Sequence, residues 1–182
     1  MNKNKKYALI IIMVTNAILI SFLESFIPIP IPVPGIKLGL ANIITMIAIV
    51  FLSWQDVLLI VIIRSFVVAI LTRGVMMIAF SLSGGILSAI VMWLLYQKLS
   101  RFVSIKGVSI AGAIIHNSAQ LLVASVMLGQ AVVLYYLPVL LISAVVTGLI
   151  TGSIGEIAIK EVSKKGVFLE ETIQEETAQE ER

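Results

Sequence analysis

Apolar residues fill most of this chain in long, nearly unbroken stretches that short polar segments separate. A helix needs about 20 such residues to cross about 30 Å of hydrocarbon, whereas a spanning strand needs only about 10 residues of alternating polarity. The pattern therefore predicts an all-α membrane protein with six transmembrane helices. Their expected ranges are residues 7–27, 36–52, 56–72, 75–99, 108–128 and 131–156.

The segment between the first two helices is unusual because every second residue is proline in its sequence PIPIPVPGI. Proline fixes φ at about −65° and lacks the backbone N–H, so the segment cannot lie inside a helix or a central strand. Isoleucine and valine alternate with the prolines, which makes the segment stiff and apolar. We expect it to form a lid, with Pro28, Pro30, Pro32, Pro34 and Gly35 as its defining residues.

Composition supports the membrane assignment. The chain is 59% hydrophobic and 13% charged, with a mean hydropathy of +1.10, whereas about a quarter of the residues of a soluble domain are charged. There is no cysteine and only one histidine, so we expect no disulfide, no thiolate chemistry and no metal site built from protein ligands alone.

The distribution of cations predicts the topology, because Lys and Arg accumulate on cytoplasmic loops. One side of the predicted bundle has only Lys37 and Arg73. The other side has Lys3, Lys5, Lys6, Lys98, Arg101, Lys106, Lys160, Lys164 and Lys165. Both termini are therefore predicted to be cytoplasmic, with the lid outside. Since topology explains the basic residues, nothing in their pattern indicates nucleic-acid binding.

Two regions differ in character along the chain. Residues 1–155 form the predicted transmembrane domain, and residues 156–182 form an acidic tail with six glutamates between Glu170 and Glu181. Few apolar residues and many like charges are typical of a disordered or loosely helical segment. We expect no site in this tail.

Three charged residues fall inside or beside the predicted helices. Arg64 lies at the middle of its helix, where a charge costs about 2.5–3.5 kcal/mol, so it either binds a substrate phosphate or carboxylate or pairs with Glu24 or a helix C-terminus. Glu24 either reaches the outer interface, orients Lys37 or Arg64, or contacts a donor group of a substrate. Lys37 opposes the dipole at the start of its predicted helix, which favours a ligand role, although snorkelling to the surface would also explain it.

Polar residues gather on one face of the fifth helix, where His116 and Gln120 are four positions apart and Asn117 lies beside them. Such groups either bind neighbouring helices, at about 0.6 kcal/mol for each hydrogen bond, or form a ligand-contacting edge. Asn42 and Thr45, one turn apart on the second helix, are placed to face the same cavity as Lys37. Tyr135 belongs either to the interfacial aromatic belt or to an entrance that supports the site.

Pairs of small residues four positions apart predict close packing between helices. These pairs are Ser81 with Gly85, Gly84 with Ser88, and Gly148 with Gly152.

The chain has no convincing catalytic group. Synthases that make prenyl chains bind diphosphate through Mg²⁺ on paired aspartates, whereas this chain has the single aspartate Asp56. It also lacks a GxxxxGK[ST] phosphate loop and a GxSxG nucleophile elbow. We therefore expect neither an enzyme nor a bound cofactor.

Four stretches together resemble one bacterial family. They are ESFIPIPIPVPGIKLGLAN from Glu24, SLSGGILSAIVMW from Ser81, GVSIAGAIIHNSAQLLVA from Gly107 and YYLPVLLISAVVTGLITG from Tyr135. The chain is similar there to heptaprenyl diphosphate synthase component I, also called the Gx transporter family. That family is grouped with the substrate-binding S components of energy-coupling factor (ECF) transporters, which bind a small molecule beneath the loop between helices 1 and 2.

The resemblance implies an uptake component of the bacterial cytoplasmic membrane that works with a transmembrane coupling subunit and two ATPases. The implied ligand is an isoprenoid, an isoprenoid precursor or another small anionic or amphipathic molecule. One departure concerns docking: S components use an alanine pair four residues apart early in helix 1, and here Ile12 follows Ala8 at that spacing. The alternative is a noncatalytic membrane subunit of a heptaprenyl diphosphate synthase. A small channel is a third interpretation, which the lack of a continuous polar stripe disfavours.

Overall fold

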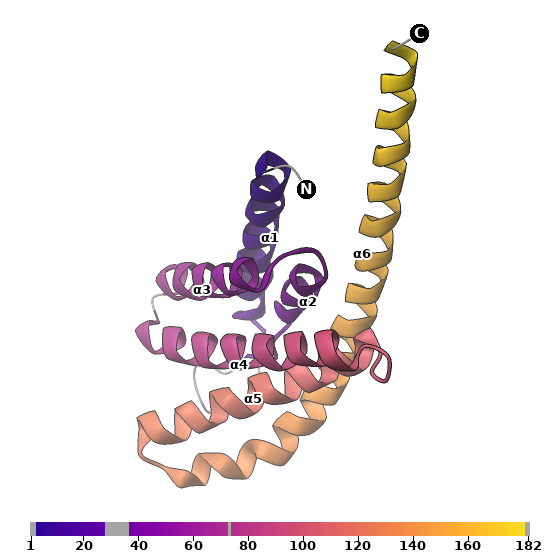
Figure 1. Ribbon diagram of the computed structural model, residues 1–182. Coiled ribbons are helices and arrows are strands. Elements are labelled where there is room, and N and C mark those ends of the chain that lie inside the picture. The colour runs from indigo at the N-terminus through magenta and orange to yellow at the C-terminus, as the bar shows by residue number, and fades with distance from the viewer. Residues whose placement is uncertain (1–2, 28–36, 73, 181–182) are drawn as a thin grey trace.

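The computed structural model describes the backbone of residues 3–27, 37–72 and 74–180, and the side chains of these except residues 75–77 and 165–180. In this part of the chain every regular element is helical, which confirms the all-α prediction (Figure 1). The elements are α1 (Lys3–Glu24), α2 (Asn42–Phe51), α3 (Trp54–Leu71), α4 (Val75–Leu99), α5 (Ile105–Leu128), the 3-10 helix η1 (Ala131–Tyr136) and α6 (Leu137–Glu180).

The helices pack mainly in chain order, with α3 against α4, α4 against α5 and α5 against α6. Figure 1 shows α3, α4 and α5 as successive layers, with α1 crossing behind α3. The short helix α2 contacts each of the other five α-helices. Side chains on α2 are therefore held at the centre of the bundle.

The helix α2 begins at Asn42, so the predicted start at Ile36 was wrong. Residues 37–41 are not helical, because Gly39 has a φ of 85°, in the left-handed region that favours glycine. With 10 residues, α2 is about 15 Å long, roughly half of the hydrocarbon thickness. Five of the six predicted α-helices are long and apolar enough to cross a membrane, and α2 is the shorter one.

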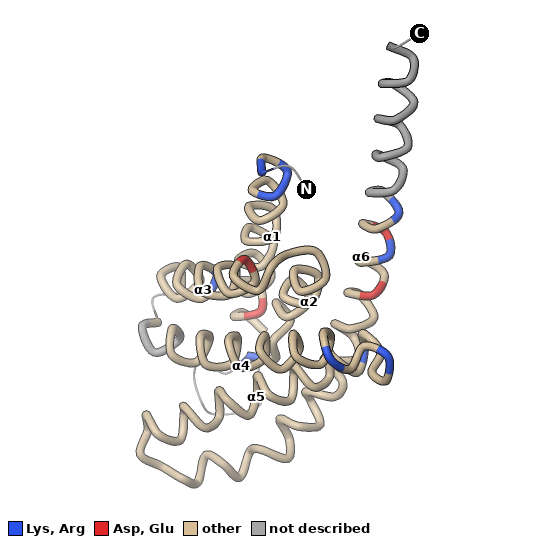
Figure 2. The backbone as a smooth tube through the Cα atoms, viewed as in Figure 1, with Lys and Arg blue, Asp and Glu red and all other residues tan. Residues whose placement is uncertain are grey.

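Salt bridges join the helix ends at the basic side of the bundle. Lys6 Nζ lies 2.8 Å from Asp56 Oδ2 and connects the start of α1 to the start of α3. Lys106 Nζ lies 3.9 Å from Glu156 Oε2 and connects the start of α5 to α6. Figure 2 shows cations near the N-terminus, around the turn between α4 and α5, and along α6. This arrangement agrees with the predicted topology, and its cytoplasmic assignment stays a prediction.

The last helix differs from the sequence prediction at both ends. The chain enters it through η1, and Pro138 lies in the first turn of α6, where a missing backbone N–H is tolerated. The helix then continues to Glu180 instead of ending near Glu156. Glutamate, lysine and glutamine are good helix formers, and Lys160 pairs with Glu156 at 2.8 Å one turn away. The division into a 1–155 domain and a 156–182 tail stays a prediction.

Two glycines let α5 and α6 approach closely. An added Cβ at Gly148 would lie 2.5 Å from the Cα of Ile110, and one at Gly152 would lie 2.8 Å from the Cα of Lys106. Both distances are shorter than van der Waals contact, and backbone atoms cannot move aside locally.

We predict that Gly148→Leu lowers the free energy of unfolding by at least about 1–3 kcal/mol, because overpacking would force α5 and α6 apart. Thermal unfolding of the purified protein in detergent measures this change. Val146→Leu on the same helix is the matched control, since Val146 is 53% exposed. Equal unfolding temperatures for the two variants would contradict the packing argument.

Candidate ligand-binding site

Glu24 is the last residue of α1 and is 2% exposed. A carboxylate is unfavourable at this end of a helix because the helix dipole is negative there. The carboxylate is compensated by the backbone N–H of Gly39, which donates to Glu24 Oε1, and by the nearby charges of Lys37 and Arg64. Glu24 thus connects the end of α1 to the segment that leads into α2.

Lys37 is 6% exposed and lies in that same segment, five residues before α2. Its Nζ donates to the backbone oxygen of Ser21 at 3.1 Å and lies 3.5 Å from Ser21 Oγ. A cation is favourable at the carbonyl end of α1. The predicted conflict with a helix dipole was therefore wrong, because Lys37 does not begin a helix and its ammonium group faces the opposite end of another one.

Arg64 is 2% exposed in the middle of α3, so its guanidinium does not snorkel to the surface. Its Nη2 donates to Asn42 Oδ1 on α2 at 3.5 Å. Its Nε and Nη1 have no hydrogen-bond partner in the described part of the chain. A buried cation with unsatisfied donors is costly unless something else satisfies it.

The polar face of α5 points into the bundle, with His116 4% exposed and both Asn117 and Gln120 fully buried. Gln120 Oε1 accepts the backbone N–H of Lys37 at 2.9 Å. Asn117 Nδ2 donates to the backbone oxygen of Leu140 on α6 at 3.2 Å. Each amide thus binds a neighbouring segment with one end, as the first interpretation predicts, and the ligand-contacting edge stays a prediction.

The cluster extends to α4 through two glycines. An added Cβ at Gly84 would lie 2.9 Å from His116 Nδ1 and 3.0 Å from the Cγ of Gln120, while one at Gly85 would lie 3.1 Å from Arg64 Nη2. The absence of side chains at these positions brings α4 against the polar groups of both α3 and α5. The structure thus places Gly84 and Gly85 at the site, in addition to the helix packing that the sequence predicted.

We predict that Gly84→Ala lowers the free energy of unfolding by about 1–3 kcal/mol, because His116 and Gln120 would have to shift. Ser83→Ala is the control, since the Ser83 hydroxyl binds only the backbone oxygen of Phe80 in its own helix, at 3.1 Å. Thermal unfolding compares the two variants. A Gly84→Ala protein as stable as the control would show that α4 does not need this close approach.

We define the buried cluster as seven buried polar residues: six that these contacts link, and Asn117, which follows His116 on α5 and binds α6. They are Glu24, Lys37, Asn42, Arg64, His116, Asn117 and Gln120. Buried polar atoms in native proteins almost always have partners, yet eight such atoms lack one among the described residues. Six of them belong to this cluster: Asn42 Nδ2, Arg64 Nε and Nη1, His116 Nδ1, Asn117 Oδ1 and Gln120 Nε2. The other two, Thr45 Oγ1 and Ser88 Oγ, lie one turn away from Asn42 and Gly84.

Comparison with known families identifies the chain at this point. A model of the family described as heptaprenyl diphosphate synthase component I matches residues 13–157. This chain belongs to that family. The match confirms the resemblance inferred from the sequence, and it includes every residue of the buried cluster. Comparison with curated proteins and with solved structures gave no match.

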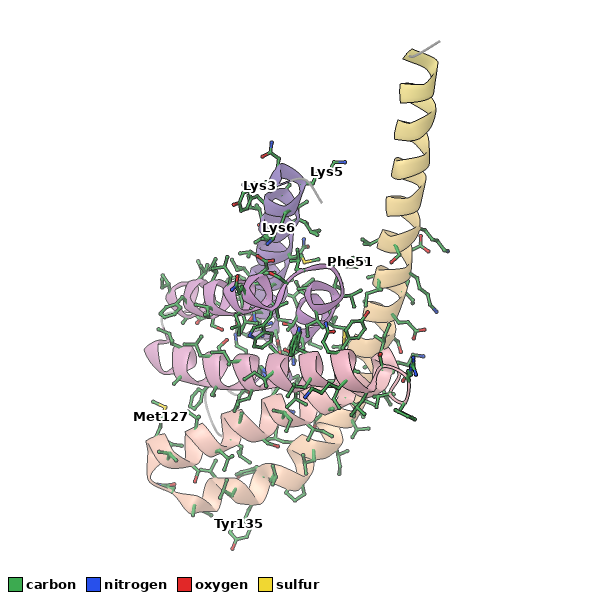
Figure 3. All side chains as sticks on the ribbon, viewed as in Figure 1. Lys3, Lys5, Lys6, Phe51, Met127 and Tyr135 are labelled. Atoms are coloured by element: carbon green, nitrogen blue, oxygen red, sulfur yellow. The ribbon has the colours of Figure 1, made fainter. Side chains whose placement is uncertain are left out.

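Some residues that the sequence predicts for the site of this component I protein are not in the buried cluster. Tyr135 is 83% exposed on η1 and points away from the bundle (Figure 3). The predicted lid residues Pro28, Pro30, Pro32, Pro34 and Gly35 lie outside the described residues. Within the described residues, no group of three or more His, Cys, Asp or Glu side chains could hold a metal ion.

Two residues that contact the cluster, Ser21 and Gly39, were not predicted from the sequence because they act through backbone atoms. Ser21 binds Lys37 mainly through its carbonyl oxygen, and Gly39 binds Glu24 through its N–H. The only sequence signal for Gly39 is a glycine close to the predicted helix start, which is typical of a turn.

Proposed function

We propose that this protein is the ligand-binding membrane component of an uptake transporter, similar to the S components of ECF transporters. The buried cluster would bind a small anionic or amphipathic molecule, such as an isoprenoid or an isoprenoid precursor. One observation carries the proposal: the cation Arg64 and the amides of Asn42 and Gln120 are buried inside an apolar bundle, and within the described residues each has hydrogen-bonding atoms without a partner. Ionisable residues inside a membrane protein mark ligand or ion sites by default.

The position of the cluster also supports a binding role. It includes Glu24 at the end of α1 and Asn42 at the start of α2, the two elements that the proline segment joins. We propose that this segment covers the site from outside the cell. The coupling subunit and two ATPases are the proposed partners, in the bacterial cytoplasmic membrane. Within the bilayer, the apolar faces of α1 and α6 would contact lipid.

Uptake measurements test this proposal. Bacterial cells that express the protein with a coupling subunit and its ATPases are compared with cells that express the protein alone, using labelled isoprenoid acids and alcohols. We expect accumulation that depends on ATPase activity and disappears in Arg64→Met. Ser109→Ala is a suitable control, since Ser109 binds Thr151 at 2.8 Å outside the cluster. Accumulation that is equal without the ATPases would count against an ECF-type mechanism.

The second candidate is a noncatalytic membrane subunit of a heptaprenyl diphosphate synthase. The description of the matching family favours it, because it names a synthase component. The only aspartate, Asp56, is bound to Lys6 and to the backbone N–H of Ser53 at 3.2 Å, so it is poorly placed to hold Mg²⁺ for catalysis. This candidate predicts that a soluble synthase subunit co-purifies with the protein. It also predicts that synthase activity is insensitive to Arg64→Met.

A further inference from the structure

Among the described residues inside the bundle, the charged side chains leave one positive charge without a partner. Lys37 and Arg64 are cations and Glu24 is the one carboxylate near them. The other acidic residues with described side chains are bound to lysines elsewhere: Asp56 to Lys6, Glu156 to Lys160, and Glu161 to Lys164. Residues 28–36 have no charged side chain in their sequence and cannot change this count.

The uncompensated charge is that of Arg64. The Lys37 ammonium group is bound to Ser21, and Glu24 lies near both cations but is fixed by the N–H of Gly39. Arg64 has only a long contact of 3.5 Å with Asn42 Oδ1. His116 lies beside Arg64 and Lys37, where a second unpaired cation would be costly, so we count its imidazole as neutral.

The unpaired atoms of the cluster are mostly donors. Each amide is oriented by its single partner, so within the described part of the chain the NH₂ groups of Asn42 and Gln120 have no acceptor, and neither do Arg64 Nε and Nη1. Among the described residues, Asn117 Oδ1 is the one unpaired atom of the cluster that must accept. An oxygen-rich anion would satisfy several of these donors at once.

We propose that the ligand head group carries a single negative charge, as a carboxylate does, and that a diphosphate head is rejected; this inference rests on the proposed function. A monoanion would neutralise the charge of Arg64. A phosphate monoester already carries a charge of about −1.5 to −2 at pH 7, and a diphosphate carries more. The excess would be buried without a partner, at a large cost.

Thermal unfolding with three tail-matched probes tests the charge. The purified full-length protein, in nanodiscs of zwitterionic lipid, is heated with octanoate, octyl diphosphate or octylammonium. Arg64→Met in the same nanodiscs corrects for effects of the probes on the bilayer. We expect octanoate alone to raise the unfolding temperature, by about 3 °C or more at saturation, in the wild type only.

The other results separate the two claims. An Arg64-dependent stabilisation by octyl diphosphate that equals or exceeds that by octanoate would overturn the monoanion inference and leave the proposed binding function intact. A lack of Arg64-dependent stabilisation by either anion would overturn both. Stabilisation by octylammonium would show that the charge count of the cluster is wrong.

Discussion

Arg64→Met is expected to lower ligand affinity by at least about 30-fold, since truncating one partner of a buried, hydrogen-bonded charge pair costs about 2–5 kcal/mol or more. The same variant should be as stable as the wild type without ligand, or more stable. Methionine fills a similar volume and removes a buried cation that has two unpaired nitrogens. Isothermal titration of the purified protein gives the affinity, and thermal unfolding gives the stability.

This pair of results distinguishes a ligand-binding residue from a structural one. If Arg64 only held α3 to α2 through Asn42, its replacement would lower the stability and affect affinity little. Arg64→Lys is the matched variant because it keeps the charge but loses the planar group, and we expect intermediate affinity. A Met variant that binds as tightly as the wild type would refute the assignment of Arg64.

Glu24→Gln is expected to lower the free energy of unfolding by about 3–5 kcal/mol, as breaking a buried charge arrangement usually does. Glutamine keeps the shape of the side chain and still accepts the N–H of Gly39, but it removes the one described carboxylate near Lys37 and Arg64 and so adds a second uncompensated positive charge. Thermal or denaturant unfolding in detergent measures the loss. The expected effect would be among the largest for a single substitution.

A second substitution shows whether charge is the cause. Glu24→Gln combined with Lys37→Met removes one carboxylate and one cation, so the pair should recover much of the stability lost in Glu24→Gln. Lys37→Met alone also removes the bond to Ser21 and should be destabilising in its own right. Additive losses in the double variant would mean that Glu24 and Lys37 do not interact through charge.

The sequence predicted the helices well because each long apolar stretch specifies a helix locally. The same reasoning predicted that Arg64 and the polar face of α5 need partners inside the bundle, since lipid offers none. The structure brings these residues to one cluster with Glu24, Lys37 and Asn42. For those residues, spacing along single helices carried enough information.

The parts that the sequence could not predict depend on contacts between distant segments. The start of α2 is displaced from Ile36 to Asn42 because backbone N–H groups of Lys37 and Gly39 bind Gln120 and Glu24. The hydrophobic pattern of residues 36–52 does not predict these contacts with Gln120 and Glu24. Likewise, the pattern of small residues at Gly84 and Gly85 indicates close packing but does not say that His116 and Arg64 lie against it.

We claim that the buried cluster holds a small ligand through Arg64, and native mass spectrometry detects such a ligand on the intact protein. The wild type and Arg64→Met are purified from the same bacterial membranes and released from detergent in the spectrometer. We predict that the wild type carries an adduct of one constant mass that the variant lacks. No adduct on the wild type, or the same adduct at equal occupancy on both proteins, would contradict the claim.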